Sequence, residues 1–198
     1  HGSYQYVRRH FATRPEPDNA DERLLPRWYW RTPGWPITKL PDYDQFSAYF
    51  NIDNGSGRIR GIYTEGNAAV KPIFSSWFGP FSDLSAGTVI LRDTGGTDHE
   101  SFDDVGLPGF QFIQDGLDYD SRLHHTHIDS YDHAVEADMR QASTVLASFL
   151  YNAATMEERM PREVMPVKPT PISDQDRARQ ARKARRQRER EARRSLDM

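Results

Sequence analysis

The chain has 198 residues, enough for one domain with a packed core and too few for two large ones. It contains no cysteine, which excludes disulfides and thiolate metal sites, so any metal ion must be held by histidine and carboxylate side chains. The sequence has no run near the roughly 20 apolar residues that span a bilayer, and it opens with neither a signal peptide nor a methionine. We therefore expect the residues before His1 to be missing, together with any targeting signal.

The charge is divided unevenly along the chain. Of its 26 Lys and Arg and 29 Asp and Glu, ten basic and five acidic residues lie in residues 173–198, which leaves sixteen basic and 24 acidic residues in the rest. The segment 173–198 has no aromatic residue and no periodic apolar face, so we expect a frayed helix or a disordered tail. It follows a proline-rich stretch at residues 161–171. These boundaries predict a domain at residues 1–160, and a connector with a basic tail at residues 161–198.

The pattern of apolar residues predicts strands that alternate with helices. Helices are expected where apolar residues recur every three or four positions, and strands where β-branched and aromatic residues cluster between turn residues. In chain order, we expect a helix at residues 1–11, strands at 46–53 and 60–63, a helix at 68–78, strands at 88–91 and 109–114, and a helix at 135–153. This alternation is typical of a layered α/β domain.

Residues 14–44 interrupt this pattern. The segment contains six prolines, which preclude a regular helix or a central strand. Loops of this length are usually functional or disordered, and the aromatic content favours order. We expect Trp28, Trp30 and Trp35 to pin the segment to the rest of the domain.

Asp53 lies at the carboxyl end of the strand expected at residues 46–53. Ligands collect at such strand ends in open α/β sheets, and a carboxylate fixed there is a good metal ligand. The turn residues Asn54 and Gly55 offer another interpretation, in which Asp53 caps the turn that follows. Local sequence alone favours the turn cap.

Asp98 and His99 follow the glycine pair Gly95 and Gly96. Paired glycines allow the backbone to approach a ligand closely, so both side chains could face a pocket. The alternative is an Asx turn at the start of a helix, with His99 on the solvent face. Local sequence leaves both interpretations open.

Four of the seven histidines lie within residues 124–133, beside two aspartates; the four are His124, His125, His127 and His133. Imidazole is the commonest metal ligand in proteins, and zinc accepts nitrogen and oxygen ligands in a tetrahedral set. The alternative is a polar surface loop in which Asp132 caps the helix that follows. A short loop rarely aims every imidazole at one point, so we expect a functional role for at least one of the four rather than for all.

Four stretches, in their order and separations, resemble the co-catalytic zinc exopeptidases of peptidase family 28, especially the carboxypeptidase Q-like branch. The stretches are FNIDNGSGRIRGIY, GGTDHESFDDVGLPGFQFIQD, HHTHIDSYDHA and EADMRQASTVLASFLYNAA, and the resemblance covers residues 2–154. It implies a three-layer α/β/α zinc-exopeptidase-like sheet domain that is incomplete at its N-terminus.

The resemblance assigns roles to three residues. Asp53 matches an aspartate ligand of one zinc ion, and His125 matches a histidine ligand of the other. Asp98 matches a carboxylate beside the metal ions, which orients their ligands or relays a proton. The other histidines of residues 124–133 have no ligand role in the family pattern, and the segment 14–44 is placed to wall the substrate cleft.

The family site also needs residues that this sequence lacks at matching positions. They are an upstream histidine, a bridging aspartate and two adjacent glutamates, one a ligand and one the general base. Gly2 and Ser3 look like the start of the helix that follows the glutamate pair, whereas Glu157 and Glu158 come after the last expected helix. We therefore expect that the missing residues precede His1 and that the 198-residue chain alone is inactive.

For the complete enzyme, the resemblance implies hydrolysis of a peptide or dipeptide by a water that bridges two zinc ions. It also implies secretion or a periplasmic location, and it allows for a homodimer. The alternative is a non-catalytic metal-binding or scaffold domain built on the histidines of residues 124–133. Nucleic-acid binding by the basic tail through counterion release is less favoured than a solvated extension, because Glu189 and Glu191 interrupt the positive charge.

Overall fold

The computed structural model describes residues 2–30, residue 32 and residues 34–169, without the side chain of Trp28. Residues 1–167 group into one compact unit, and the second unit, residues 168–198, lies almost wholly outside the described part of the chain. The tail expected at residues 173–198 therefore lies outside the description. Within the described residues, no helix combines the length and the apolar character needed to cross a bilayer.

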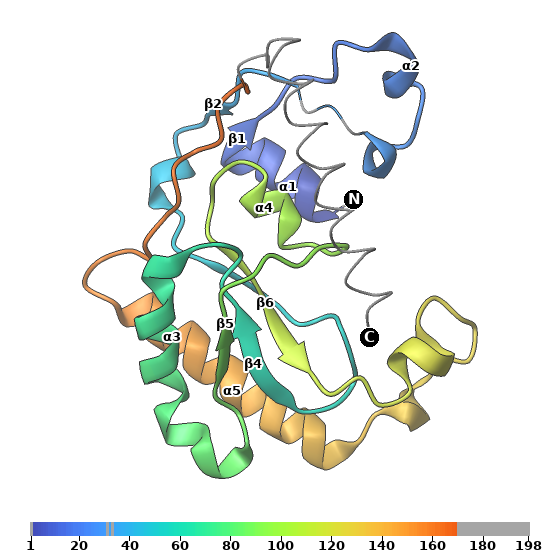
Figure 1. Ribbon diagram of the computed structural model, residues 1–198, viewed down its shortest axis with the longest axis vertical. Coiled ribbons are helices and arrows are strands. Elements are labelled where there is room, and N and C mark those ends of the chain that lie inside the picture. Colours follow the sequence, from blue (N-terminus) through green and yellow to red (C-terminus); the bar gives the residue numbers. More distant parts are fainter. Residues whose placement is uncertain (1, 31, 33, 170–198) are drawn as a thin grey trace, which may run out of the picture. The chain divides into compact units, whose positions relative to one another are not determined.

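A four-stranded mixed sheet forms the centre of the first unit (Figure 1). Its strands, in spatial order, are β3 (Tyr49–Asn51), β6 (Gly109–Gln114), β4 (Ile59–Tyr63) and β5 (Thr88–Ile90). The outer strands run parallel to their neighbours, whereas β4 and β6 pair antiparallel. The sheet and the surrounding helices make this an α/β domain, as expected.

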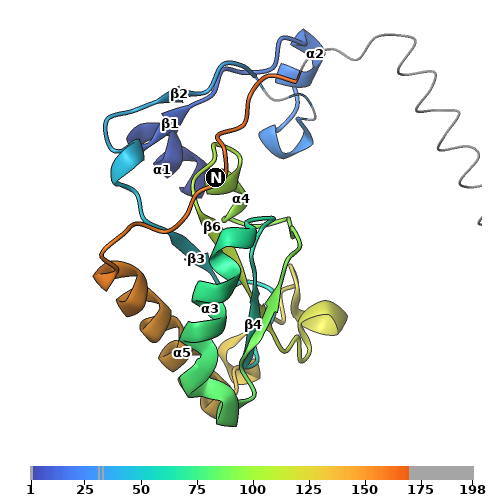
Figure 2. The ribbon, with the colours of Figure 1, turned by 60° about the vertical axis from the view of Figure 1, so that its left-hand side comes forward.

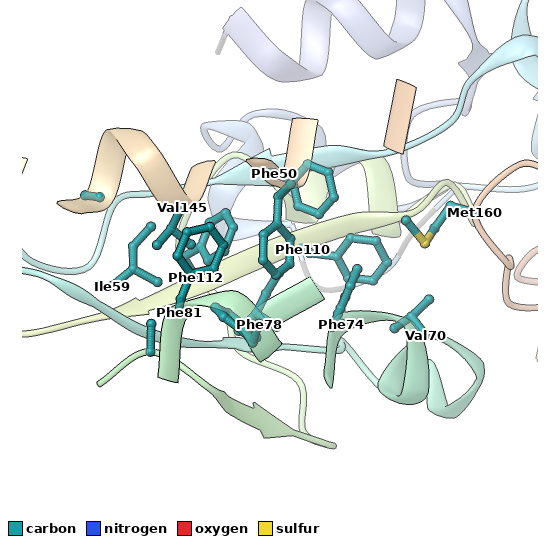
Figure 3. Packing of buried hydrophobic residues seen from close by; sticks show 14 residues of the cluster. Phe50, Ile59, Val70, Phe74, Phe78, Phe81, Phe110, Phe112, Val145 and Met160 are labelled. Carbon is teal, nitrogen blue, oxygen red and sulfur yellow. The ribbon is translucent and has the colours of Figure 1, made fainter. Parts of the chain in front are cut away.

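One face of the sheet is covered by α3 (Lys71–Phe78) and α5 (Glu136–Thr155), which lie together on the same side in both ribbon views (Figures 1 and 2). The ring of Phe149 on α5 is fully buried and lies 5.6 Å, centroid to centroid, from the ring of Phe74 on α3. From the sheet, Phe50 and Phe112 reach the same cluster (Figure 3). This aromatic core is the main link between the helices and the strands.

The opposite face carries a second, smaller cluster. Because successive side chains of a strand point to opposite faces, the burial of Phe50 in the first cluster directs Tyr49 to the other side. There the Tyr49 ring stacks on Phe102 at a centroid distance of 4.3 Å. Phe102 lies on α4 (Glu100–Asp103), and the same cluster includes Val7 of α1 (Gly2–His10). Helices therefore lie on both faces of the sheet, which agrees with the expected three-layer arrangement.

The proline-rich segment leaves the domain and returns to it through a short two-stranded ladder. Strand β1 (Ala12–Thr13) pairs antiparallel with β2 (Thr38–Lys39), and between them lie α2 (Ala20–Arg23) and the 3-10 turn η1 (Arg27–Tyr29). Trp35 packs against the second cluster and so pins the segment, as expected. Trp30 instead donates its indole N–H to the Leu25 carbonyl within the segment.

Two expected elements differ from the structure. The strand expected at residues 46–53 is limited to β3, because Phe46 packs into the second cluster and its carbonyl accepts a hydrogen bond from Arg162 instead of a strand partner. The helix expected at residues 68–78 begins with a 3-10 turn, Ala68–Val70, before α3. Asn67 caps that turn by accepting from the Ala69 N–H.

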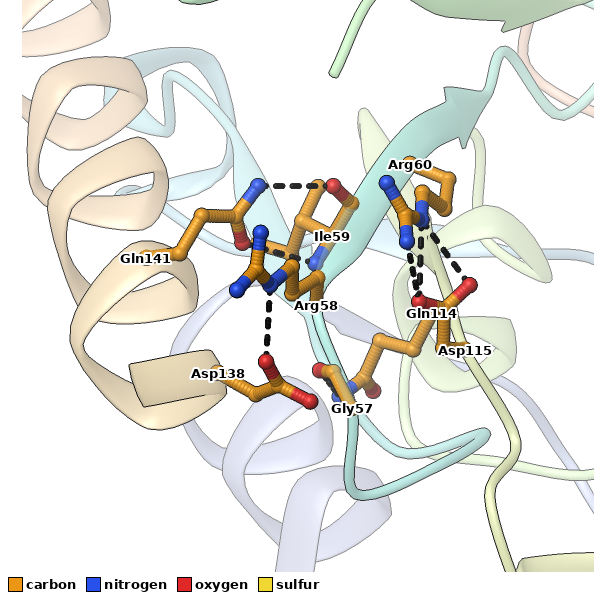
Figure 4. Close-up of polar contacts among 8 residues, drawn as sticks. All are labelled: Gly57, Arg58, Ile59, Arg60, Gln114, Asp115, Asp138 and Gln141. Atoms are coloured by element: carbon orange, nitrogen blue, oxygen red, sulfur yellow. Dashed lines mark hydrogen bonds and ion pairs between the residues drawn. The ribbon is translucent and has the colours of Figure 1, made fainter. Parts of the chain in front are cut away.

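Side-chain bridges fix α5 and the end of β6 to β4 (Figure 4). The Gln141 amide exchanges two hydrogen bonds of 2.9 Å with the backbone of Ile59. Beside it, Arg58 Nε donates to Asp138 Oδ1 at 2.7 Å. A further ion pair joins Arg60 of β4 to Asp115, the residue that follows β6. These bridges set where the chain leaves the sheet toward the histidine-rich loop.

Candidate functional site

Asp53 lies two residues beyond the end of β3, in an exposed position. One of its carboxylate oxygens, Oδ2, accepts a hydrogen bond from the Thr97 hydroxyl, and its backbone carbonyl accepts from the Tyr119 hydroxyl. The turn after Asp53 is held by other side chains, since Asn54 and Gln114 each bond the backbone N–H of the other. The Asp53 carboxylate is therefore directed to the loop that contains Thr97, and the turn is closed without it.

His125 occupies a strained position in the loop after β6. Its φ of 58° is in the left-handed region, which non-glycine residues rarely adopt and which is enriched at functional sites. Its imidazole lies 3.8 Å, centroid to centroid, from that of His124, which in turn stacks on Tyr119. The loop is closed by Thr126, whose hydroxyl contacts the carbonyl of Leu123 at 2.9 Å.

Asp53 and His125 line the same pocket, although they are 72 positions apart in the sequence. The pocket has a volume of about 340 Å³. Its remaining lining residues are Asn54, Thr94, Gly95, Gly96, Thr97, Gln111, Tyr119, His124 and Asp129. The convergence that the sequence predicted for these two residues is therefore present, whereas His127 and His133 do not belong to this lining.

The donor atoms around this pocket match zinc in type and fall short in number. Carboxylate oxygen and imidazole nitrogen are both accepted zinc ligands. Within residues 2–30, 32 and 34–169, however, no three His, Asp or Glu side chains are arranged to hold a metal ion together. Asp53 and His125 therefore do not form a closed site by themselves, and their role as ligands stays a prediction.

Asp98 lies in an adjoining pocket of about 710 Å³. The Ser3 hydroxyl of α1 donates to Asp98 Oδ1 at 2.5 Å and lies 3.1 Å from the Ser101 hydroxyl. Gly96 and Thr97 line both pockets and separate Asp98 from Asp53. Asp98, the carboxylate expected beside the metal ions, therefore follows Thr97 directly in the sequence but does not line the pocket of Asp53 and His125.

A chain of hydrogen bonds that no sequence motif marks orients Asp53. The Tyr49 hydroxyl donates to Asn51 Oδ1, and Asn51 Nδ2 donates to Thr97 Oγ1 and, at 2.5 Å, to Gln111 Oε1. Thr97 then donates to Asp53. Because hydrogen bonds to a ligand fix its orientation and basicity, Thr97 acts as a positioning residue for the carboxylate. The alternation of Tyr49 and Asn51 on one face of β3 was the available signal.

The glycine-rich loop rests on a buried pair, His99 and Glu65. His99 is 1% exposed, so the solvent-facing alternative for this residue is wrong. Its Nε2 lies 3.0 Å from the Thr94 carbonyl and 3.6 Å from Glu65 Oε1, while Glu65 Oε2 accepts from the Thr94 N–H at 2.7 Å. Burial raises the pKa of Glu65 to about 7, against the lowering effect of the Thr94 bond. No local motif marks Glu65, because its role arises from tertiary burial.

Comparison with known proteins gives one match. The model of peptidase family M28 matches residues 36–150, which is more than half of the chain and includes Asp53, Asp98 and His125. Neither the curated proteins nor the solved structures include a match to the chain. The matched region contains the sheet, α3, most of α5 and the pocket shared by Asp53 and His125. The chain therefore belongs to peptidase family M28.

Proposed function

We propose that the chain contributes Asp53 and His125 to a two-zinc site that hydrolyses a terminal peptide bond, as in an aminopeptidase or a dipeptidase. Members of family M28 are peptidases that generally depend on zinc, so peptides are the substrate class. One observation carries the assignment of Asp53 and His125 to this site: the strand-end carboxylate and the loop imidazole line the same pocket of about 340 Å³.

The residues around the pocket divide the tasks. Asp53 and His125 would each hold a different ion, and Thr97 keeps the Asp53 carboxylate in one orientation. When bound, two zinc ions would activate water by lowering its pKa toward about 7 and would polarise the scissile carbonyl. The pocket on the other side of Gly96 and Thr97 is large enough, at about 710 Å³, to receive the part of the peptide beyond the scissile bond.

The chain lacks matching positions for the family's glutamate base and for the remaining ligands, since its adjacent glutamates, Glu157 and Glu158, follow α5. A glutamate base moves the proton from water to the leaving amine. We therefore propose that the 198-residue chain alone does not turn over aminoacyl or dipeptide substrates. For the complete enzyme, we propose a secreted or periplasmic location.

Zinc binding and turnover test this proposal. In the chain fused to a segment that supplies the remaining ligands, competition with a chromophoric chelator should show that Asp53→Ala and His125→Ala each weaken zinc binding, whereas the matched substitution His133→Ala leaves it unchanged. Fusing to the chain a segment with the remaining ligands and the glutamate should give turnover that either of the first two substitutions abolishes. Zinc-dependent turnover by the unmodified chain would contradict the proposal.

The alternative, a metal-binding or scaffold domain based on the histidine cluster, has less support. His127 and His133 lie outside the lining of the pocket, and His133 Nε2 lies 3.9 Å from Asp132 Oδ2. That function would require zinc binding that survives Asp53→Ala and is lost when these two histidines are replaced. The same chelator experiment therefore separates the two functions.

A further inference from the structure

The proline-rich segment forms one wall of the larger pocket. From this segment, the lining includes Arg14, Pro15, Arg27, Trp30 and Gly34. The part of the segment up to residue 35 lies outside the family match at residues 36–150. The pocket is therefore built partly from residues that the family model does not cover, next to a pocket that it does cover.

The wall is held by specific contacts. The Glu22 carboxylate accepts from the Thr32 N–H at 2.7 Å, and Arg23 Nη1 donates to the Pro17 carbonyl at 2.9 Å. At the base of the segment, a Cβ atom on Gly34 would collide with the Pro15 carbonyl oxygen, so the two backbones touch. These contacts, with the β1–β2 ladder, give the pocket a defined side.

The two arginines of the wall differ in how their charge is compensated. Arg27 places its guanidinium 3.4 Å from the centroid of the Tyr4 ring, and its Nη2 lies 3.4 Å from Asp104 Oδ2. Arg14 has its guanidinium carbon 4.5 Å from the centroid of the Trp35 ring, and its Nε is buried without a hydrogen-bond partner. Among the described residues, no carboxylate forms an ion pair with Arg14.

A cation without an ion-pair partner in a pocket favours an anionic ligand, and the more distant Asp104 carboxylate offsets part of the Arg14 charge. Burial lowers the pKa of Arg14 from its ordinary value, although a guanidinium stays charged at neutral pH. Arginine binds carboxylates through two parallel N–H···O bonds, and a ligand carboxylate would satisfy donors that the protein leaves unused. The lining also includes Asp98, Glu100 and Asp104, which disfavours ligands with more than one negative charge.

We propose that the larger pocket binds a carboxylate of the peptide substrate and that Arg14 is its anchor. This inference rests on the proposed function, because it places the scissile bond in the pocket of Asp53 and His125, across Gly96 and Thr97. The carboxylate is either the free C-terminus of a short peptide or an acidic side chain. Both sources present the same group to Arg14.

Peptide binding to the zinc-free 198-residue chain tests the inference. Three probes separate the sources: N-acetyl-Ala-Ala, its C-terminal amide, and N-acetyl-Glu-Ala-amide. The Trp30 indole N–H, at the pocket wall, reports binding by NMR and is assigned with Trp30→Phe. We expect at least one of the two carboxylate probes to bind about tenfold more tightly than the amide without a carboxylate. Equal affinity for all three would overturn the inference.

Matched variants identify the anchor. Arg14→Gln should remove the preference for the carboxylate, whereas Arg14→Lys should retain part of it because the charge remains. Arg140→Gln is the control, because it removes the same charge from the exposed face of α5. There, 79% of the Arg140 side chain is accessible. If Arg14→Gln keeps the wild-type preference, or if Arg140→Gln loses it equally, the inference is wrong. If Arg14→Gln fails to fold, Arg14→Lys decides the question, because a preference equal to that of the wild type would overturn the inference.

Failure here is distinguishable from failure of the proposed function. The peptide titration contains no zinc, whereas the zinc titration contains no peptide and depends on Asp53 and His125. Loss of the carboxylate preference together with retained zinc binding at Asp53 would overturn the Arg14 anchor alone. The reverse result would leave the anchor in place and remove the metal centre.

Discussion

The two pockets on either side of Gly96 and Thr97 are built in different ways. The pocket of Asp53 and His125 is placed by the ends of β3 and β6, whose strands are fixed by the aromatic core. The Arg14 pocket depends on a proline-rich segment that is held by a two-stranded ladder and local hydrogen bonds. In many proteins a sheet positions the reacting residues and a loop positions the residues that recognise the ligand, because loops tolerate sequence change better than the core does.

The largest expected effect is on the aromatic core that fixes the strands beneath the pocket of Asp53 and His125. Phe149→Ala removes a fully buried ring that contacts Phe50, Phe74, Phe78 and Phe112, and should lower the free energy of unfolding by about 3–5 kcal/mol. Chemical denaturation measures the change. Tyr151→Ala on the same helix, with the residue 70% exposed, should change stability by less than about 0.5 kcal/mol. Comparable losses in both variants would contradict the assigned core.

The next effect concerns Glu65, which accepts a hydrogen bond from the Thr94 N–H in the loop that contains Gly96 and Thr97. Burial raises the pKa of Glu65 from 4.5 to about 7, so the folded state binds a proton more tightly than the unfolded state does. The stabilisation from protonated Glu65 is complete below pH 4.5 and is lost as the pH rises through about 7, by about 1–3 kcal/mol. Glu65→Gln should flatten the unfolding free energy between pH 5 and 8. An unchanged pH profile would show that Glu65 titrates normally.

Gly34→Ala separates the pockets most clearly. The added Cβ would press on the Pro15 carbonyl oxygen and should cost about 1–3 kcal/mol, which local loosening of the segment can relieve. Hydrogen exchange should rise around α2 and η1 and stay unchanged in β6. Carboxylate binding should weaken while zinc binding is retained. If Gly34→Ala raised hydrogen exchange equally in the segment and in the sheet, the two would unfold together and the predicted local effect would be wrong.

The smallest effect is expected at Thr97, on the border between the pockets. Thr97→Val keeps the shape and removes the hydroxyl that donates to Asp53, and loss of such a contact to a ligand typically weakens metal binding about tenfold or more. Chelator competition measures the change. Thr144→Val on α5, where the hydroxyl bonds the Arg140 carbonyl at 2.8 Å, is the matched control. Equal zinc affinity in the two variants would remove Thr97 from the positioning chain.

Sequence periodicity predicted the regular elements well where packing and periodicity agree. Strand β6 has the expected bounds, and α5 spans Glu136–Thr155 against an expected 135–153. The strand expected at residues 46–53 was too long, because Phe46 is drawn into the second cluster. Periodicity describes one element at a time, whereas the end of a strand depends on which neighbour its backbone meets.

The candidate site was predictable in part. The motif order indicated that Asp53 and His125 meet, and the structure places both at one pocket. Asp98 lies in the adjoining pocket because Ser3 of α1 and the wall at Thr97 direct it there. Glu65 and Arg14 carry no recognisable motif, since the roles of both come from burial against distant segments. Contacts of this kind appear only once the chain has folded.

The shared metal centre is best tested by a zinc titration, followed by NMR, of the chain fused to a segment that supplies the remaining ligands. If Asp53 and His125 belong to one two-ion centre, the backbone resonance of Asp53 and the imidazole resonances of His125 should both shift as the two ions bind. His133 should respond weakly, because it lies outside the pocket lining. Shifts confined to the histidine-rich loop, with Asp53 unaffected at saturating zinc, would contradict the account.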